Sequence, residues 1–194
     1  MSPVAATAKR RATAPMRLAA SFVCLTSLLV AGCVGAPPSF MPNLAEARVR
    51  IAGTIGTVSA SVDPAAQAAG DVHMSYGSDK IPALWQRGLA SAIGQSRLFD
   101  GSPRVFDVNV TIYKMKPPRT GGTIETPARA RYQLIDAGSH AVVFEAMIET
   151  VGHVGPDGNF LGVVRVRDSI DRAVQRNITQ FVERLAKAPE LTRP

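Results

Sequence analysis

Three successive segments alternate apolar and polar residues, and this pattern constrains the fold more than any other feature of the 194-residue chain. They cover residues 104–114, 127–135 and 141–151. Successive side chains of a strand point to opposite faces, so each segment predicts a strand with one buried and one wet side. Short connections predict an antiparallel meander. The expected inward residues are Phe106, Val108, Val110, Ile112, Ala128, Ala130, Tyr132, Leu134, Val142, Phe144, Ala146 and Ile148.

Two segments with apolar residues at spacings of three and four flank this region, and each predicts an amphipathic helix. The first covers about 15 residues, with Ser78 or Asp79 as the capping residue and Pro82 in the first turn. The second covers residues 163–185. Their apolar positions are Ile81, Leu84, Trp85, Leu89, Ala92 and Ile93, then Val163, Val166, Ile170, Ala173, Val174, Ile178, Phe181, Val182 and Leu185.

An additional strand over residues 48–55 and a long loop over residues 57–77 complete the expected organisation. The order of elements is then β-α-β-β-β-α. A strand, a helix and a returning strand favour a right-handed parallel crossover. Each helix has a single apolar face, so both should cover the same side of the sheet. The sequence therefore predicts an α+β domain, with a four-stranded mixed sheet and two helices packed on one face.

The first 32 residues differ in charge from the rest of the chain. They contain four basic residues and no acidic residue, whereas residues 33–194 carry a net charge of only +3. An apolar run of 15 residues covers positions 18–32. A membrane-spanning helix needs about 20 apolar residues, so the short run and its basic flank predict a cleaved secretory signal. Met1 and Met16 both remain open as the start of translation.

The apolar run ends in Val30-Ala31-Gly32-Cys33, which resembles the lipobox of bacterial lipoproteins. The resemblance implies that Cys33 becomes the first residue of the mature protein and carries acyl chains. Each buried CH₂ contributes about 0.8 kcal/mol, so several chains anchor a protein without a spanning helix. The alternative is an ordinary signal-peptidase site that happens to contain a cysteine. Val34 replaces the aspartate that retains such lipoproteins in the inner membrane, which implies the outer membrane.

These features divide the chain into four regions. A signal peptide covers residues 1–32, and the lipidated Cys33 with a Pro-rich tether covers residues 33–46. A single periplasmic α+β domain covers residues 47–188, and a C-terminal tail covers residues 189–194. The mature chain of 162 residues suits one domain. Cys33 is its only cysteine, which excludes an internal disulfide and a zinc site built from thiolates.

The lipobox, the tether, Leu84-Trp85, Leu98-Phe99, the three strands and a closing helix with Asn177-Ile178 together resemble small periplasmic lipoproteins. The chain is similar to the ABC-type transport auxiliary lipoproteins and the lipopolysaccharide-assembly lipoproteins. Residues 129–138 resemble their strand followed by an Asp-x-x-Gly turn. The resemblance implies an outer-membrane-tethered protein that assists an envelope transport or assembly machine and performs no chemistry of its own.

Motifs for chemistry are lacking in the sequence. His73, His140 and His153 are far apart, and none occurs in a metal-ligand spacing. No G-x-S-x-G string, phosphate-binding loop or hexapeptide repeat typical of acyltransferases occurs. Asp168 and Asp171 lie among arginines on the second helix and indicate solvated ion pairs. We therefore expect no catalytic residue, no metal and no cofactor, although an envelope enzyme with a site built from loops remains an alternative.

Basic residues gather around the second and third strands, and they indicate an anion-binding face. Export from the cytoplasm argues against nucleic acid as the ligand, whereas anionic lipid headgroups attract Lys and Arg at a membrane surface. The alternative is an ordinary solvated sheet face. Besides the bilayer, we expect an envelope protein as partner, bound through the sheet face or an edge strand. The residues of this face are Lys114, Lys116, Arg119, Arg129 and Arg131.

Overall fold

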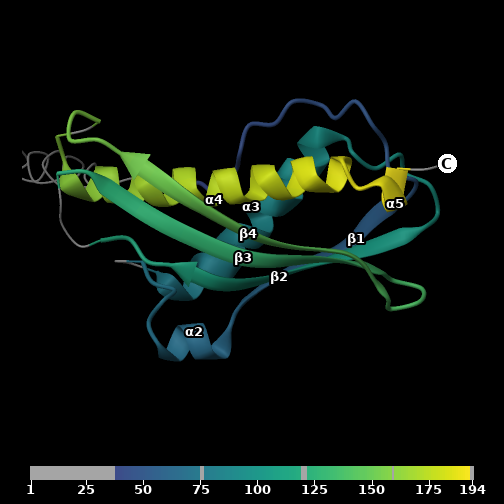
Figure 1. Ribbon diagram of the computed structural model, residues 1–194, viewed down its shortest axis with the longest axis horizontal. Helices are drawn as coiled ribbons and strands as arrows, with labels where there is room; N and C mark the ends of the chain where they lie inside the picture. Colours follow the sequence, from purple (N-terminus) through teal and green to yellow (C-terminus); the bar gives the residue numbers. More distant parts are fainter. Residues whose placement is uncertain (1–37, 75–76, 119–121, 159, 193–194) are drawn as a thin grey trace, which may run out of the picture. The chain divides into compact units, whose positions relative to one another are not determined.

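The computed structural model describes residues 38–74, 77–118, 122–158 and 160–192. Its single sheet has the strand order β1-β2-β3-β4, with β1 parallel to β2 and the other neighbours antiparallel (Figure 1). This confirms the predicted mixed four-stranded α+β fold. The elements are β1 (Thr54–Val62), α2 (Pro64–Ala68), the 3-10 turn η1 (Ser78–Lys80), α3 (Ile81–Ser96), β2 (Val105–Met115), β3 (Ile124–Asp136), β4 (Val142–Val154), α4 (Gly162–Ala186) and α5 (Pro189–Thr192).

The predicted inward residues of β2 and β3 are buried, as the alternation requires. In β4 the prediction for Val142 is wrong, because its side chain is 48% exposed. Leu134 pairs with Phe144, but Ile135 pairs with Val142, so β4 has an extra residue there. This bulge changes which face the next side chain occupies. β4 also continues through His153 and Val154, beyond the predicted end at residue 151.

The first strand was predicted too early in the chain. Residues 48–53 lie outside it, and β1 occupies Thr54–Val62, much of which was expected to be loop. This segment is rich in serine and alanine, and an edge strand that is half-buried needs few large side chains. The loop that remains contains α2, whose first turn is capped by Asp63 accepting from the Ala66 N–H at 3.0 Å.

Both predicted helices are present, but the first lacks the predicted side-chain cap. α3 begins after Lys80 without a side-chain cap. The Ser78 hydroxyl instead accepts from the Met74 N–H and donates to the Met74 carbonyl, both at 3.0 Å. α4 covers the expected segment. In the region expected to be a tail, Leu191 of α5 is buried.

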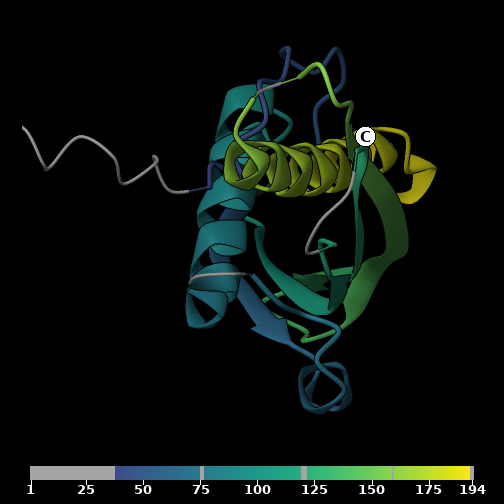
Figure 2. The same ribbon diagram turned by 90° about the vertical axis from the view of Figure 1, so that its left-hand side faces the viewer.

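A buried polar cluster joins the two helices to the sheet. Trp85 Nε1 donates to the Tyr132 hydroxyl at 2.9 Å, and that hydroxyl donates to Asn177 Oδ1 at 2.8 Å. Asn177 Nδ2 donates in turn to the Ile148 carbonyl and to Thr150 Oγ1, both at 3.1 Å. Burial raises the pKa of Tyr132 far above its usual value, so the phenol stays protonated. Contacts from α3 and α4 to one tyrosine place both helices on the same face of the sheet (Figure 2).

Gly152 allows the backbone of α4 to approach β4 closely. A Cβ at this position would overlap the Ser169 carbonyl oxygen and would lie 2.6 Å from the Ala173 amide nitrogen. Both of these are backbone atoms of α4 and cannot move without displacing the helix. The small residues of α4 therefore face the one position of β4 that has no side chain.

Replacing Gly152 with alanine should destabilise the protein by about 3 kcal/mol or more, because the new methyl group would push α4 away from the sheet. The measurement is the free energy of unfolding in urea. Gly94→Ala in α3 is the matched control, since nothing lies within 4 Å of its added Cβ. That variant should gain about 0.5–1 kcal/mol from helix propensity. Equal effects at the two positions would contradict the close approach.

Candidate functional site

The sheet face opposite α3 and α4 brings together three of the predicted basic residues. Arg129 and Arg131 of β3 each place the guanidinium carbon 5.9 Å from the ring centre of Tyr113 in β2. Lys114 is the register partner of Arg129. A bulge in β2 between Ile112 and Lys114 accompanies this arrangement. The result is a cluster of two arginines and a lysine around one aromatic ring.

The other two predicted residues are placed differently. Lys116 lies just beyond β2 and forms an ion pair with Asp71 at 3.3 Å. Arg119 lies outside the described residues. Arg129 also forms a cross-strand ion pair, with its Nε 3.0 Å from Oε1 of Glu149 in β4. The face as a whole is not basic, since the three clustered bases share it with the carboxylates of Asp107, Glu125, Glu145 and Glu149.

A groove of about 650 Å³ lies between β1 and α3, and we call it the β1 groove. Apolar side chains from both elements line it, and charged side chains border it. The apolar lining includes Ile55 and Val58 of β1, Ile93 of α3, and Phe99. The charged residues that border it are Glu46, Arg50, Arg97 and Asp100.

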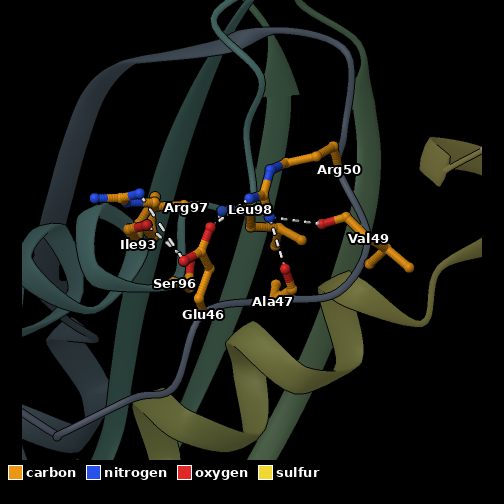
Figure 3. Close-up of polar contacts among 8 residues, drawn as sticks. All are labelled: Glu46, Ala47, Val49, Arg50, Ile93, Ser96, Arg97 and Leu98. Atoms are coloured by element: carbon orange, nitrogen blue, oxygen red, sulfur yellow. Dashed lines mark hydrogen bonds and ion pairs between the residues drawn. The ribbon is translucent and has the colours of Figure 1, made fainter.

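Glu46 lies between two arginines at the border of the β1 groove (Figure 3). Its carboxylate is 2.6 Å from Arg50 Nη2 and 3.9 Å from Arg97 Nη1. Arg50 also donates to the Ala47 carbonyl at 2.6 Å. Arg97 ends α3 with a left-handed backbone, φ 46°, which turns its side chain off the helix. Two guanidinium groups thus share one carboxylate, and both remain partly exposed to a carboxylate or phosphate ligand.

Asp100 completes the border, and one of its carboxylate oxygens is held by local hydrogen bonds. Its Oδ1 accepts from the Ser102 hydroxyl at 2.6 Å, from the Gly53 N–H at 3.0 Å and from the Ser102 N–H at 2.9 Å. These hydrogen bonds, that of the Ser102 hydroxyl above all, lower the pKa of Asp100 to about 2. Sequence reasoning missed this site, because its residues come from segments about 50 positions apart and no motif joins them.

The two edges of the sheet differ in how they are covered. On β4, arginines of α4 donate to alternate carbonyls: Arg172 to His153, Arg176 to Val151 and Arg184 to Met147, at 2.7, 2.9 and 3.2 Å. Four residues of a helix rise about 6 Å, and two residues of a strand rise about 6.6 Å. The spacing of these arginines therefore matches the repeat of the strand edge, which is protected from pairing.

The free edge of β1 is less covered. The Asp63 N–H pairs with Ile112 of β2, so by alternation Val58, Ala60 and Val62 direct their backbone groups to the free edge. Gln86 of α3 donates to the Val58 carbonyl at 2.7 Å. Among the described residues, no side chain bonds to the backbone of Ala60 or Val62. This open edge begins beside the β1 groove.

The chain is already packed against the domain at Ser39 and Phe40, within the region assigned to the tether. Phe40 is 1% exposed and meets Trp85 edge to face, with ring centres 6.1 Å apart. Gly88 of α3 makes room for it, because a Cβ there would overlap the Phe40 carbonyl. Gln175 of α4 donates to the Ser39 carbonyl at 2.7 Å. These contacts fix the entry of the chain on α3 and α4.

Asp171 of α4 also holds this entry and is not the solvated residue that the sequence suggested. Its carboxylate accepts from the Ser39 N–H and is half-buried. Burial raises its pKa to about 6, against the lowering effects of that hydrogen bond and of Arg167. Asp168, one turn earlier, instead pairs with Arg167 at 3.1 Å.

The histidines do not come together. His153 lies 3.3 Å from Glu125 across β3 and β4, and His140 occupies the turn between these strands with φ 59°. His73 donates its backbone N–H to Met115 at 2.8 Å. In the described part of the chain, no group of three or more histidine, cysteine and acidic side chains could hold a metal ion. No helix within the described ranges has the length and apolarity to cross a membrane. Cys33 lies outside those ranges.

Neither a protein-family model nor a curated protein sequence matches the chain. Solved structures do match. A Xanthomonas campestris protein of the family DUF330 is 14% identical with a TM-score of 0.52, over 78% of this chain and 94% of that one. This likeness shows a shared fold.

Two further structures are similar at lower TM-scores. A candidate lipoprotein of Caulobacter crescentus is 14% identical with a TM-score of 0.46, over 71% of this chain and 93% of its own. A minor lipoprotein of Acinetobacter baumannii is 6% identical with a TM-score of 0.41, over 70% and 92%.

The raised pKa of Asp171 predicts a specific pH dependence of stability. In the unfolded chain an aspartate titrates near pH 4, and in the folded protein Asp171 titrates near pH 6. Ionisation is therefore less favourable in the folded state, so stability is lost as the pH rises through this interval. Asp171→Asn keeps an acceptor for the Ser39 N–H and should gain stability at about pH 7.5, with no gain at about pH 4.

The measurement is urea unfolding at the two pH values. Glu183→Gln, at an exposed position of the same helix, is the control, and it should show no gain at the higher pH. A constant difference between Asp171→Asn and the unsubstituted protein at both pH values would show that burial does not disfavour the charge.

Proposed function

We propose that this protein is a bacterial envelope lipoprotein, acylated at Cys33, that acts as a non-catalytic binding component on the periplasmic face of the outer membrane. The packing of Ser39 and Phe40 is the observation that carries the proposal. Cys33 lies six residue steps before Ser39, and these steps span at most about 22 Å when fully extended. The anchored domain would thus be held at the membrane surface, within reach of membrane-bound partners.

The partner class follows from the resemblance to transport auxiliary and lipopolysaccharide-assembly lipoproteins. An accessory role in such a system requires a surface for another protein. The open edge of β1 supports this role, because backbone groups there can pair with an added strand. The β1 groove lies beside that edge and offers apolar side chains and two arginines.

A second candidate is a stand-alone lipoprotein that binds its partner through the polar sheet face. The cluster of Lys114, Arg129 and Arg131 around Tyr113 favours it. The four carboxylates on the same face weaken it. A catalytic role has no comparable support, because the clustered residues lack a nucleophile next to a base.

Acylation of Cys33 is tested by mass spectrometry of the protein purified from bacterial membranes. The mature chain should begin at Cys33 and carry the mass of its acyl groups. Cys33→Ser should leave the signal uncleaved, whereas Cys24→Ser is the matched control and should change nothing. A bare thiol at Cys33 in a chain that retains residues 18–32 would overturn the lipoprotein proposal.

Partner binding at the β1 edge is tested by photo-crosslinking in intact cells. A photoreactive residue at Ser61 on β1 should give a protein adduct several times more abundant than one at Val151 on β4. Ala60→Pro should abolish the adduct, because it removes a donor on the free edge and leaves the pairing with β2 intact. Equal adducts at both edges would exclude strand addition at β1 and favour the sheet face.

A further inference from the structure

Three apolar side chains are exposed together where α4 begins, and we call them the apolar tip. Phe160 is 99% exposed, Leu161 54% and Val163 65%. Apolar side chains exposed next to one another, unlike single ones, mark a surface that binds a partner or a membrane. Other exposed apolar residues, such as Val105 and Val142, lie at the opposite end of the sheet.

The apolar tip lies at the end of the sheet where β2 and β4 finish and β3 begins. Ile124 at the start of β3 pairs with Val154 at the end of β4, and α4 starts beside them, on the left in Figure 1. Arg165 of α4 donates to the Gly122 carbonyl before β3 at 2.5 Å. Lys114 and Lys116 lie at the same end, where β2 finishes. Basic side chains therefore lie at this end of the sheet, together with the carboxylates of Glu125 and Asp157.

The segment at Ser39, where the chain first packs on the domain, lies close to this end of the sheet. Ser39 is held by Asp171 and Gln175, and α4 begins nine residues before Asp171 at Gly162. Nine helical residues rise about 14 Å. The reach of about 22 Å from Ser39 to Cys33 exceeds this distance. An acylated Cys33 and the apolar tip can therefore reach the same bilayer surface.

We propose that the apolar tip inserts into the headgroup region of the bilayer that holds the acyl chains of Cys33. This inference rests on the proposed lipid anchor and adds a second contact to it. Apolar side chains at an interface enter about 5–10 Å, to the boundary of headgroups and acyl chains. Lys and Arg beside them are attracted to anionic headgroups. Two contacts on one membrane would fix the orientation of the domain, which a single flexible anchor cannot do.

The test is tryptophan quenching by lipid. The acylated, full-length mature protein carrying Phe160→Trp is reconstituted into vesicles of phosphatidylethanolamine and phosphatidylglycerol with brominated acyl chains. Insertion should remove about half of the added emission, compared with vesicles without bromine. Val142→Trp is the matched control, because Val142 is also exposed but lies at the far end of the sheet. The emission of Val142→Trp should be the same in brominated and unbrominated vesicles. The emission of the buried Trp85 should be the same in both as well.

Vesicle flotation and mass spectrometry distinguish a failure of the insertion proposal from a failure of the proposed lipid anchor. Acylated protein that floats with the vesicles, with Phe160→Trp emission unquenched, would overturn the inference and leave the lipid anchor standing. A blue-shifted but unquenched emission would show that a protein surface covers the apolar tip, which also overturns it. Protein that lacks the acyl mass and does not float would overturn the proposed function and this inference with it.

Discussion

The placement of both helices on the sheet depends on the hydrogen bonds of the Asn177 side-chain amide. This amide accepts from Tyr132, which accepts from Trp85, and it donates to β4. A buried amide or phenol without partners costs about 1–3 kcal/mol, so this chain of hydrogen bonds favours one placement of both helices over alternatives of equal apolar contact. That placement sets the register of α4 along β4. The arginines of α4 meet the carbonyls of the strand edge only in this register.

The alternation of apolar and polar residues was sufficient to predict β2 and β3, because both strands bury one face along their whole length. Helical spacing was likewise sufficient for α3 and α4. β1 was misplaced because its small residues resemble the composition of a loop. Its formation as a strand depends on pairing with β2. The exposure of Val142 depends on a bulge, which has no local signature here. The β1 groove could not be predicted, since Arg97 reaches it only through the left-handed end of α3.

The two edges of the sheet show how one fold can be closed to pairing on one side and open on the other. Long charged side chains from α4 cover β4, at the cost of ordering their rotamers. On β1, Gln86 covers one carbonyl. This asymmetry limits where a partner strand can add without rearrangement. Candidate binding features thus gather around β1 and the polar face.

The parallel pairing of β1 with β2 sets the distance between the β1 groove and the start of α4. Both strands start at the same end of the sheet, so the β1 groove beside Ile55 lies near Phe106. β2 finishes at Met115, toward the end of the sheet where α4 begins. Ten steps along β2 measure about 33 Å. With the start of α4 against lipid, the groove would stand one strand length above the bilayer. A protein that meets it there would have to rise about 3 nm out of that membrane or arrive from the aqueous phase.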